Sequence, residues 1–234
     1  MPHINKKRQN THLLIMQLAA KHFVEDGYSN TSMKHIAKEL DVSPGNVTFY
    51  FPSKEHMLAV LVDELYDFQK LVTEQTAKEG TSSLLAYCLE LTVMAAACSE
   101  SYVARDLYTS AYVSPMTLEL VRKYDTEKTR AVFGEFRPDW DYSEWRATEN
   151  IVSGIEYATI TTREENTPLE KQIEKTLDSI MFLYGVPEEI RQRKIEKVLS
   201  VDYRALGRRI MGDFIAYIEN ISEENLKKSR QPRW

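Results

Sequence analysis

The side chains best suited to metal or redox chemistry are the histidines and cysteines, and their spacing argues against both. All five histidines lie in the first 56 residues, at His3, His12, His22, His35 and His56. These positions lack the close spacing of a metal-ligand motif, so we expect no metal site. Cys88 and Cys98 stand in apolar helical segments with no histidine nearby, which is typical of small buried residues in a reducing compartment.

The motifs of enzymatic chemistry are also missing from the sequence. The chain contains no GxGxxG, GxxxxGK, HExxH or CxxC motif. The paired carboxylates Glu164-Glu165 and Glu188-Glu189 have the pattern of solvated helix ends. We therefore expect a protein that is not an enzyme and that needs no cofactor.

The stretch DVSPGNVTFYFPSKE, residues 41–55, carries groups that could contact nucleic acid. Its centre, VTFYF, has the β-branched and aromatic composition of a strand. However, Ser43 can cap a helix with Pro44 at its first position, and Pro52 ends it after two turns. The free N–H groups at the start of such a helix favour a phosphate or a base edge.

The distribution of charge supports a role for this end of the chain. Residues 1–56 hold seven Lys/Arg and five Asp/Glu, a balance of +2, and because the whole chain carries −5, the remainder carries −7. A slightly basic N-terminal segment followed by an acidic remainder indicates that only the N-terminal segment contacts phosphates. The run Lys6-Lys7-Arg8 is either a solvated charge cluster or an arm that reaches the minor groove.

Helices must position these groups. Apolar residues recur at helical spacing over about 10–26, and Gly27 is expected to close that helix. Helices at 33–40 and 44–50, separated by a short turn, predict a helix-turn-helix whose small core includes Ile36, Ala37 and Val47. A long fourth helix follows Ser53, and further helices are predicted at 82–99, 101–112, 115–136, 143–163, 169–184, 187–199 and 202–220. No apolar run approaches the roughly 20 residues that span a bilayer, so we expect a cytoplasmic protein without a membrane segment.

Many spaced positions between about 10 and 60 together resemble one known family. They are Ile15, Ala19, Phe23, Gly27-Tyr28, Thr31-Ser32-Met33, Ile36-Ala37, Leu40-Asp41-Val42-Ser43, Gly45-Asn46-Val47, Tyr50-Phe51, Ser53-Lys54-Glu55 and Leu58. This pattern is similar to the N-terminal domain of the TetR/AcrR family of transcriptional regulators. The resemblance implies an all-α chain: a three-helix helix-turn-helix DNA-binding domain at 1–56, joined by a long helix to a helical ligand-binding and dimerisation domain at 57–234. Residues 187–221 would form a C-terminal extension of open role.

The family resemblance also implies a function. It predicts a homodimer that places two recognition helices in successive major grooves of a palindromic operator, about 34–36 Å apart. Such regulators are mostly repressors, released from DNA by a small molecule bound in the C-terminal domain. An alternative is a regulator controlled by a protein partner without a small-molecule ligand.

The resemblance carries specific site residues with it. The DNA-binding candidates are Thr31, Ser32, Lys34, Ser43, Pro44, Gly45, Asn46, Thr48, Phe49, Tyr50 and Lys54. Asn46 is the leading candidate for direct readout because an amide can bond bidentately to adenine. The family commonly has tyrosine where Thr48 stands, so Phe49 or Tyr50 would take over that phosphate contact. It commonly has glycine where Asp41 stands, and aspartate tolerates the left-handed conformation of such a turn.

The second domain offers weaker candidates. Polar and aromatic residues that could line a ligand cavity are Tyr87, Met94, Tyr102, Arg105, Tyr108, Trp145, Glu149 and Tyr157, although core packing, solvent exposure or interhelical pairing also explains each of them. The candidates for the dimer interface are Ile151, Gly154, Ile155, Ile173, Leu177 and Ile180, on the helices at 143–163 and 169–184.

Overall fold

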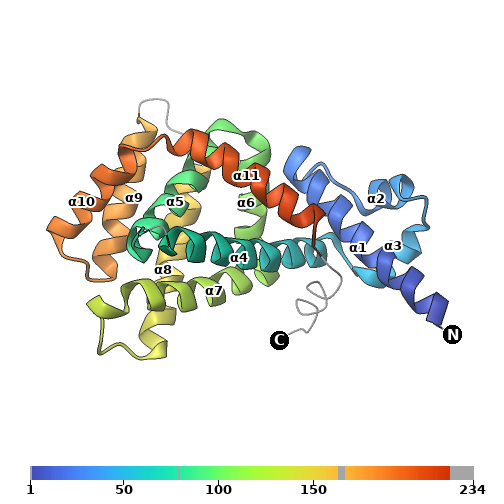
Figure 1. Cartoon of the computed structure of the whole chain (residues 1–234), viewed down its shortest axis with the longest axis horizontal. Coiled ribbons are helices and arrows are strands. Elements are labelled where there is room, and N and C mark those ends of the chain that lie inside the picture. Colours follow the sequence, from blue (N-terminus) through green and yellow to red (C-terminus); the bar gives the residue numbers. More distant parts are fainter. Residues whose placement is uncertain (1, 79, 163–166, 222–234) are drawn as a thin grey trace.

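The computed structural model describes residues 2–78, 80–162 and 167–221, and this part of the chain is helical without strands. The helices are α1 (Pro2–Glu25), α2 (Met33–Glu39), α3 (Pro44–Tyr50), α4 (Lys54–Lys78), α5 (Ser83–Glu100), α6 (Tyr102–Val113), α7 (Pro115–Phe133), α8 (Tyr142–Thr161), α9 (Leu169–Leu183), α10 (Glu188–Leu199) and α11 (Tyr203–Glu219). The predicted all-α class is confirmed. In Figure 1, α1 to α3 form one end of the molecule, and α4 and α11 run from it into a larger body.

The predicted boundaries differ from the observed ones at a few points. Helix α1 begins at Pro2 rather than near residue 10, so the run Lys6-Lys7-Arg8 is helical, although its side chains lie outside the description. The helix predicted for 115–136 ends at Phe133, and a 3-10 turn (Gly134–Phe136) follows. The predicted end of α8 at 163 lies outside the described residues.

The N-terminal unit is held by an apolar core between α1, α2, α3 and the start of α4. Phe23, Ile36, Val47 and Phe51 are almost completely buried in this N-terminal core. The predicted caps are present: the hydroxyls of Ser32 and Ser43 accept the N–H groups of His35 and Asn46 at 3.1 Å. VTFYF is thus helical, because its cap and the packing of Val47 and Phe51 outweigh a strand-like composition.

The turn between α2 and α3 has the expected left-handed conformation. Asp41 adopts a φ of 52°, the only positive φ of a non-glycine residue in the described part of the chain. Its neighbour Val42 donates its N–H to the carbonyl of Ala37 at 2.9 Å, which closes the end of α2. Gly27, with a φ of 96°, closes α1 as predicted.

Helix α5 is the centre of the larger body. It packs against α11, α6, α10, α8 and α9, and its buried side chains include Leu84, Tyr87 and Leu91. Both cysteines lie on it and are buried, as predicted, and burial raises the pKa of each thiol to about 12. By length and composition α5 could cross a membrane, and half of it is buried inside the fold.

The C-terminal extension has a definite place. Phe214 and Ile218 on α11, with Ile221 just beyond it, lie in the N-terminal core. The Gln17 side chain of α1 donates to the carbonyl of Glu219 at 2.9 Å. Helix α11 therefore packs on α1 and connects the N-terminal unit with the larger body (Figure 1). Because α11 contacts both parts, the domain boundary at residue 56 stays a prediction.

Candidate DNA-binding surface

Helix α3 presents most of its predicted contact residues to solvent. Pro44, Gly45 and Thr48 are exposed, and Asn46 is partly exposed. Phe49 is 72% exposed, which is unusual for a large apolar side chain. Val47 therefore packs one face of α3 against the core, and the opposite face is exposed and could enter a DNA groove.

The aromatic residues at the end of α3 and just after it divide between surface and core. Phe51 is 2% exposed and stacks on the His12 ring at a centroid distance of 4.7 Å. The Tyr50 ring is partly buried, 5.7 Å from His12 and 5.2 Å from the exposed Phe49 ring. The Thr48 hydroxyl donates to the carbonyls of Gly45 and Pro44, at 3.2 and 3.3 Å, so it does not extend outward as a tyrosine would.

Two residues expected to contact phosphate have internal partners. Thr31 is buried, and its hydroxyl donates to the carbonyl of Gly27 at 2.8 Å. The Lys54 ammonium donates to the carbonyls of Tyr28 and Thr31, at 2.8 and 3.1 Å. Burial lowers the pKa of Lys54. Both residues fix the loop between α1 and α2, whereas Ser32 and Lys34 are exposed at the start of α2.

The candidates for the dimer interface do not share one surface. Ile173, Leu177 and Ile180 fill the core of the single chain, and Ile155 packs against the same core. The assignment of these residues to an interface is corrected, because the stripe of α9 that they occupy is turned inward. Ile151, Gly154 and Tyr157 lie on the exposed face of α8, and Phe182 is exposed at the end of α9.

The ligand candidates also separate. Tyr102 is 61% exposed, with the Arg105 guanidinium 5.7 Å from its ring, and Tyr157 is exposed as well. Tyr87, Trp145 and Glu149 are buried in the body, whereas Met94 and Tyr108 line a cavity of about 480 Å³. Of the residues predicted to line a ligand cavity, Met94 and Tyr108 therefore line this one.

A buried acidic cluster is the main feature that sequence patterns missed. Asp125, Glu149 and Glu156 are all nearly inaccessible, and one carboxylate oxygen of each lies within 4.8 Å of the others. The Tyr184 hydroxyl donates to Glu149 at 2.9 Å, and the Tyr112 hydroxyl donates to Glu156 at 2.8 Å. Burial and the neighbouring Asp125 charge raise the pKa of Glu149 to about 8 and that of Glu156 well above its usual range. Glu149, for which solvent exposure or interhelical pairing was an alternative to ligand binding, is thus buried in a shared cluster with Glu156. The sequence signal for this cluster is a carboxylate among apolar helical positions.

A short capped helix, set by a left-handed turn against a second helix and exposed on its outer face, defines the class of helix-turn-helix DNA-binding domains. Residues 15–61 match the family model described as "Bacterial regulatory proteins, tetR family". The N-terminal helix-turn-helix of this chain is therefore similar to that of the TetR family.

Curated relatives match about a third of the chain. The chain is 40% identical over 83 residues to the uncharacterised HTH-type transcriptional regulator YuxN of Bacillus subtilis (strain 168), which is 35% of this chain and 28% of that protein. It is 31% identical over 78 residues to the probable HTH-type transcriptional regulator YttP of the same organism, which is 33% of this chain and 38% of that protein. The matched part is therefore about a third of each relative's length.

Solved structures show a more distant likeness over most of the chain. A gamma-butyrolactone receptor (ArpA-like protein) is 19% identical with a TM-score of 0.44, covering 88% of this chain and 99% of that one. The TetR family protein CprB from Streptomyces coelicolor A3(2) is 18% identical with a TM-score of 0.42, over the same shares. Neither likeness extends what the N-terminal match shows.

Proposed function

We propose that this chain is a sequence-specific DNA-binding transcriptional regulator that represses transcription as a homodimer on a palindromic operator. The observation that carries the proposal is the exposed outer face of α3, with Asn46 and Phe49, on a helix-turn-helix of the TetR type. Asn46 suits readout of adenine, and Phe49 suits apolar contact with a thymine methyl group. Neither side chain is needed to hold the N-terminal core together.

The experiment that tests this function is selection of bound sequences from a pool of random duplex DNA, using the full-length chain. We expect a palindromic motif whose half-sites are about one helical turn apart, with affinity that falls steeply as salt rises. Recovery of unrelated sequences with no common motif would refute sequence-specific binding. A motif without two-fold symmetry would refute the homodimer.

The exposed apolar face of α8 is the surface that we propose for the dimer contact. Ile151 is 57% exposed there, and one turn further along, an added Cβ at Gly154 would meet no atom within 4 Å. Phe182, at the end of α9, is 63% exposed. Close backbone approach at Gly154, flanked by apolar side chains, suits a self-complementary interface.

The cavity favours control by a small molecule over control by a protein partner. Its volume of about 480 Å³ is in the range of small-molecule sites, and it lies among α4, α5, α6 and α11. Its wall is mainly apolar, and its polar members include Gln69, Gln75, Thr81, Glu90, Arg209 and Asp213. The Oε1 atom of Gln69 is buried and has no hydrogen-bond partner in the described structure, so it can accept a hydrogen bond from a ligand.

The helices that line this cavity also build the N-terminal core. Helix α4 contributes Leu58 to the core and Gln69 to the cavity, and α11 contributes Phe214 to the core and Asp213 to the cavity. A further link comes from Asp106 on α6, which accepts the N–H of Ser29 at 2.7 Å, in the loop before α2. A ligand that moves α4 or α11 would therefore shift the helices against which the helix-turn-helix packs. This shift would release the protein from DNA.

Replacing Gln69 with leucine is expected to raise the free energy of unfolding of the ligand-free protein by about 1–2 kcal/mol. The reason is that a buried acceptor without a partner destabilises the fold by roughly that amount. The matched control is Gln172→Leu, because the Gln172 amide donates to the carbonyl of Thr159 at 3.0 Å and its loss should be destabilising. Urea denaturation of both variants checks the prediction, and a loss of stability in Gln69→Leu would contradict it.

A further inference from the structure

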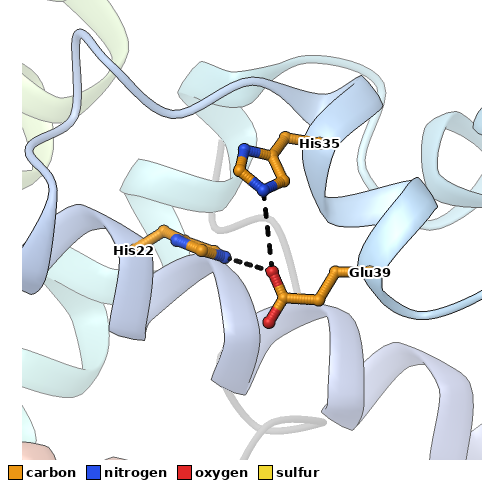
Figure 2. A group of neighbouring side chains, drawn as sticks. All are labelled: His22, His35 and Glu39. Atoms are coloured by element: carbon orange, nitrogen blue, oxygen red, sulfur yellow. Dashed lines mark hydrogen bonds and ion pairs between the residues drawn. The ribbon is translucent and has the colours of Figure 1, made fainter.

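Three side chains from two helices meet at the junction of α1 and α2. Figure 2 shows His22 from α1 pointing toward His35 and Glu39 from α2. The His22 Nε2 atom is 2.8 Å from Glu39 Oε2, and the His35 Nε2 atom is 3.8 Å from the same oxygen. One ligand atom from each residue lies within 4.8 Å of the others.

A fourth residue orients this group. The Nδ1 atom of His22 is 2.6 Å from a carboxylate oxygen of Asp26, one turn further along α1. A histidine that gives its Nδ1 proton to a carboxylate keeps a lone pair on Nε2, and this is the arrangement seen behind metal-bound histidines. Nε2 is the atom that faces Glu39 and His35.

We propose that His22, His35 and Glu39 form a binding site for a divalent first-row transition-metal ion such as Zn²⁺. Two imidazole nitrogens and one carboxylate oxygen are a donor set that Zn²⁺ accepts, and a tetrahedral ion would leave its fourth position to water. Zinc–nitrogen bonds of about 2.0–2.1 Å place neighbouring ligand atoms roughly 3.3 Å apart. Two of the three separations, 2.8 and 3.8 Å, lie on either side of that value and within about half an ångström of it, and the third is no more than 4.8 Å.

The proposed site combines two ligands on α2 with one on α1. His35 and Glu39 are four residues apart and share one face of α2, which is a usual spacing for two ligands on a helix. His22 is 17 positions from Glu39 and reaches the site only because α1 and α2 pack together. The expectation of no metal site rested on the missing sequence motif, which does not register this contact.

The same residues could instead form only an ion pair. Burial lowers the pKa of His22, but the hydrogen bonds to Asp26 and Glu39 outweigh it, so the pKa is raised overall. A protonated His22 would bridge the two carboxylates without using His35. The ion pair and the metal site therefore differ in one prediction: only the metal site depends on His35, whose side chain is 58% exposed.

The test uses the full-length, tag-free chain with Co²⁺ as a spectroscopic probe, followed by competition with Zn²⁺. We expect one equivalent of Co²⁺ to give the intense visible absorption of a low-coordinate site and Zn²⁺ to displace it. His35→Ala and Glu39→Gln should each weaken binding by at least about 10-fold, and Asp26→Asn, which removes the orienting carboxylate, by about 10–100-fold. His56→Ala is the matched control, because its ring nitrogen bonds the Ser53 hydroxyl at the start of α4, and it should bind as the wild type does.

Two outcomes would overturn the site. One is a spectrum that stays that of hydrated Co²⁺, and the other is binding that His35→Ala leaves unchanged. Circular dichroism confirms folding of each variant, and the exposed His35 makes His35→Ala the variant least able to unfold the chain. None of these measurements involves DNA, so failure of the metal site is distinguishable from failure of the proposed regulator.

The consequence of an occupied site rests on the proposed function. The ion would clamp α2 to α1 and so fix the helix against which α3 packs. Zn²⁺ should then change the affinity for the selected palindrome in the wild type and leave it unchanged in His35→Ala. An equal response of both proteins would refute this coupling.

Discussion

Replacing Asn46 with alanine is expected to weaken specific DNA binding by about 100-fold or more, with no loss of stability. A bidentate contact to a base contributes about 1–3 kcal/mol of discrimination, and in the proposed homodimer the contact is lost twice. The backbone N–H of Asn46 still bonds the Ser43 hydroxyl, so the cap of α3 survives the substitution. Fluorescence anisotropy on the selected palindrome, at fixed salt, measures the change.

Two further variants make this prediction specific. Lys34→Ala, on exposed α2, should weaken binding to all sequences alike and lower the slope of log affinity against log salt by roughly one per protomer. Glu196→Ala, on the exposed face of α10 in the distant body, should change neither quantity. If Asn46→Ala retained wild-type affinity for the palindrome, the assignment of α3 as the recognition helix would be wrong.

Replacing Glu149 with glutamine is expected to reduce the pH dependence of stability in the C-terminal body, leaving the contribution of Glu156. Burial, together with the Asp125 charge, raises the pKa of Glu149 in the folded state from 4.5 to about 8. Between these two values the unfolded chain loses its proton while the folded chain keeps it. The stabilisation from this group is therefore complete below pH 4.5 and is lost progressively as pH rises to about 8, by about 1.4 kcal/mol per pH unit where the difference is full.

The glutamine variant should be more stable than the wild type at pH 8–9, by about 2–3 kcal/mol, because an amide of the same shape does not ionise beside Asp125. Its carbonyl oxygen can still accept the Tyr184 hydroxyl, which is 2.9 Å from Glu149 in the wild type. Thermal or urea unfolding of both proteins from pH 5 to pH 9 measures the difference between the two curves. The exposed Glu196→Gln is the control, and parallel curves for wild type and Glu149→Gln would contradict the burial of an un-ionised Glu149.

Local patterns in the sequence were enough to predict the helices and the N-terminal helix-turn-helix. Caps and breakers such as Ser43, Pro44 and Pro52 act within a few residues, and the apolar spacing that buries Ile36 and Val47 acts within two turns. These are local causes, so they can be recognised without the fold. The all-α class and the exposed face of α3 follow from them. In the second domain the same patterns located the helices, but they did not distinguish core residues from interface residues. Ile173 and Ile151 are the same residue type on amphipathic helices, and they differ only in which neighbouring helices cover them.

Only the tertiary structure decided which distant side chains meet. The chain position of His22 does not indicate that it lies beside Glu39, and that of Glu149 does not indicate that it lies beside Asp125. Likewise, the placement of Phe214 from α11 in the N-terminal core depends on how the C-terminal helix crosses the body. Each of these contacts is set by the packing of whole helices. Burial of the apolar faces fixes the angle and position at which two helices pack, and the polar groups are brought together as a result. The sequence by itself therefore determined a helical protein with an N-terminal helix-turn-helix, and the tertiary structure decided which other elements contact that helix-turn-helix.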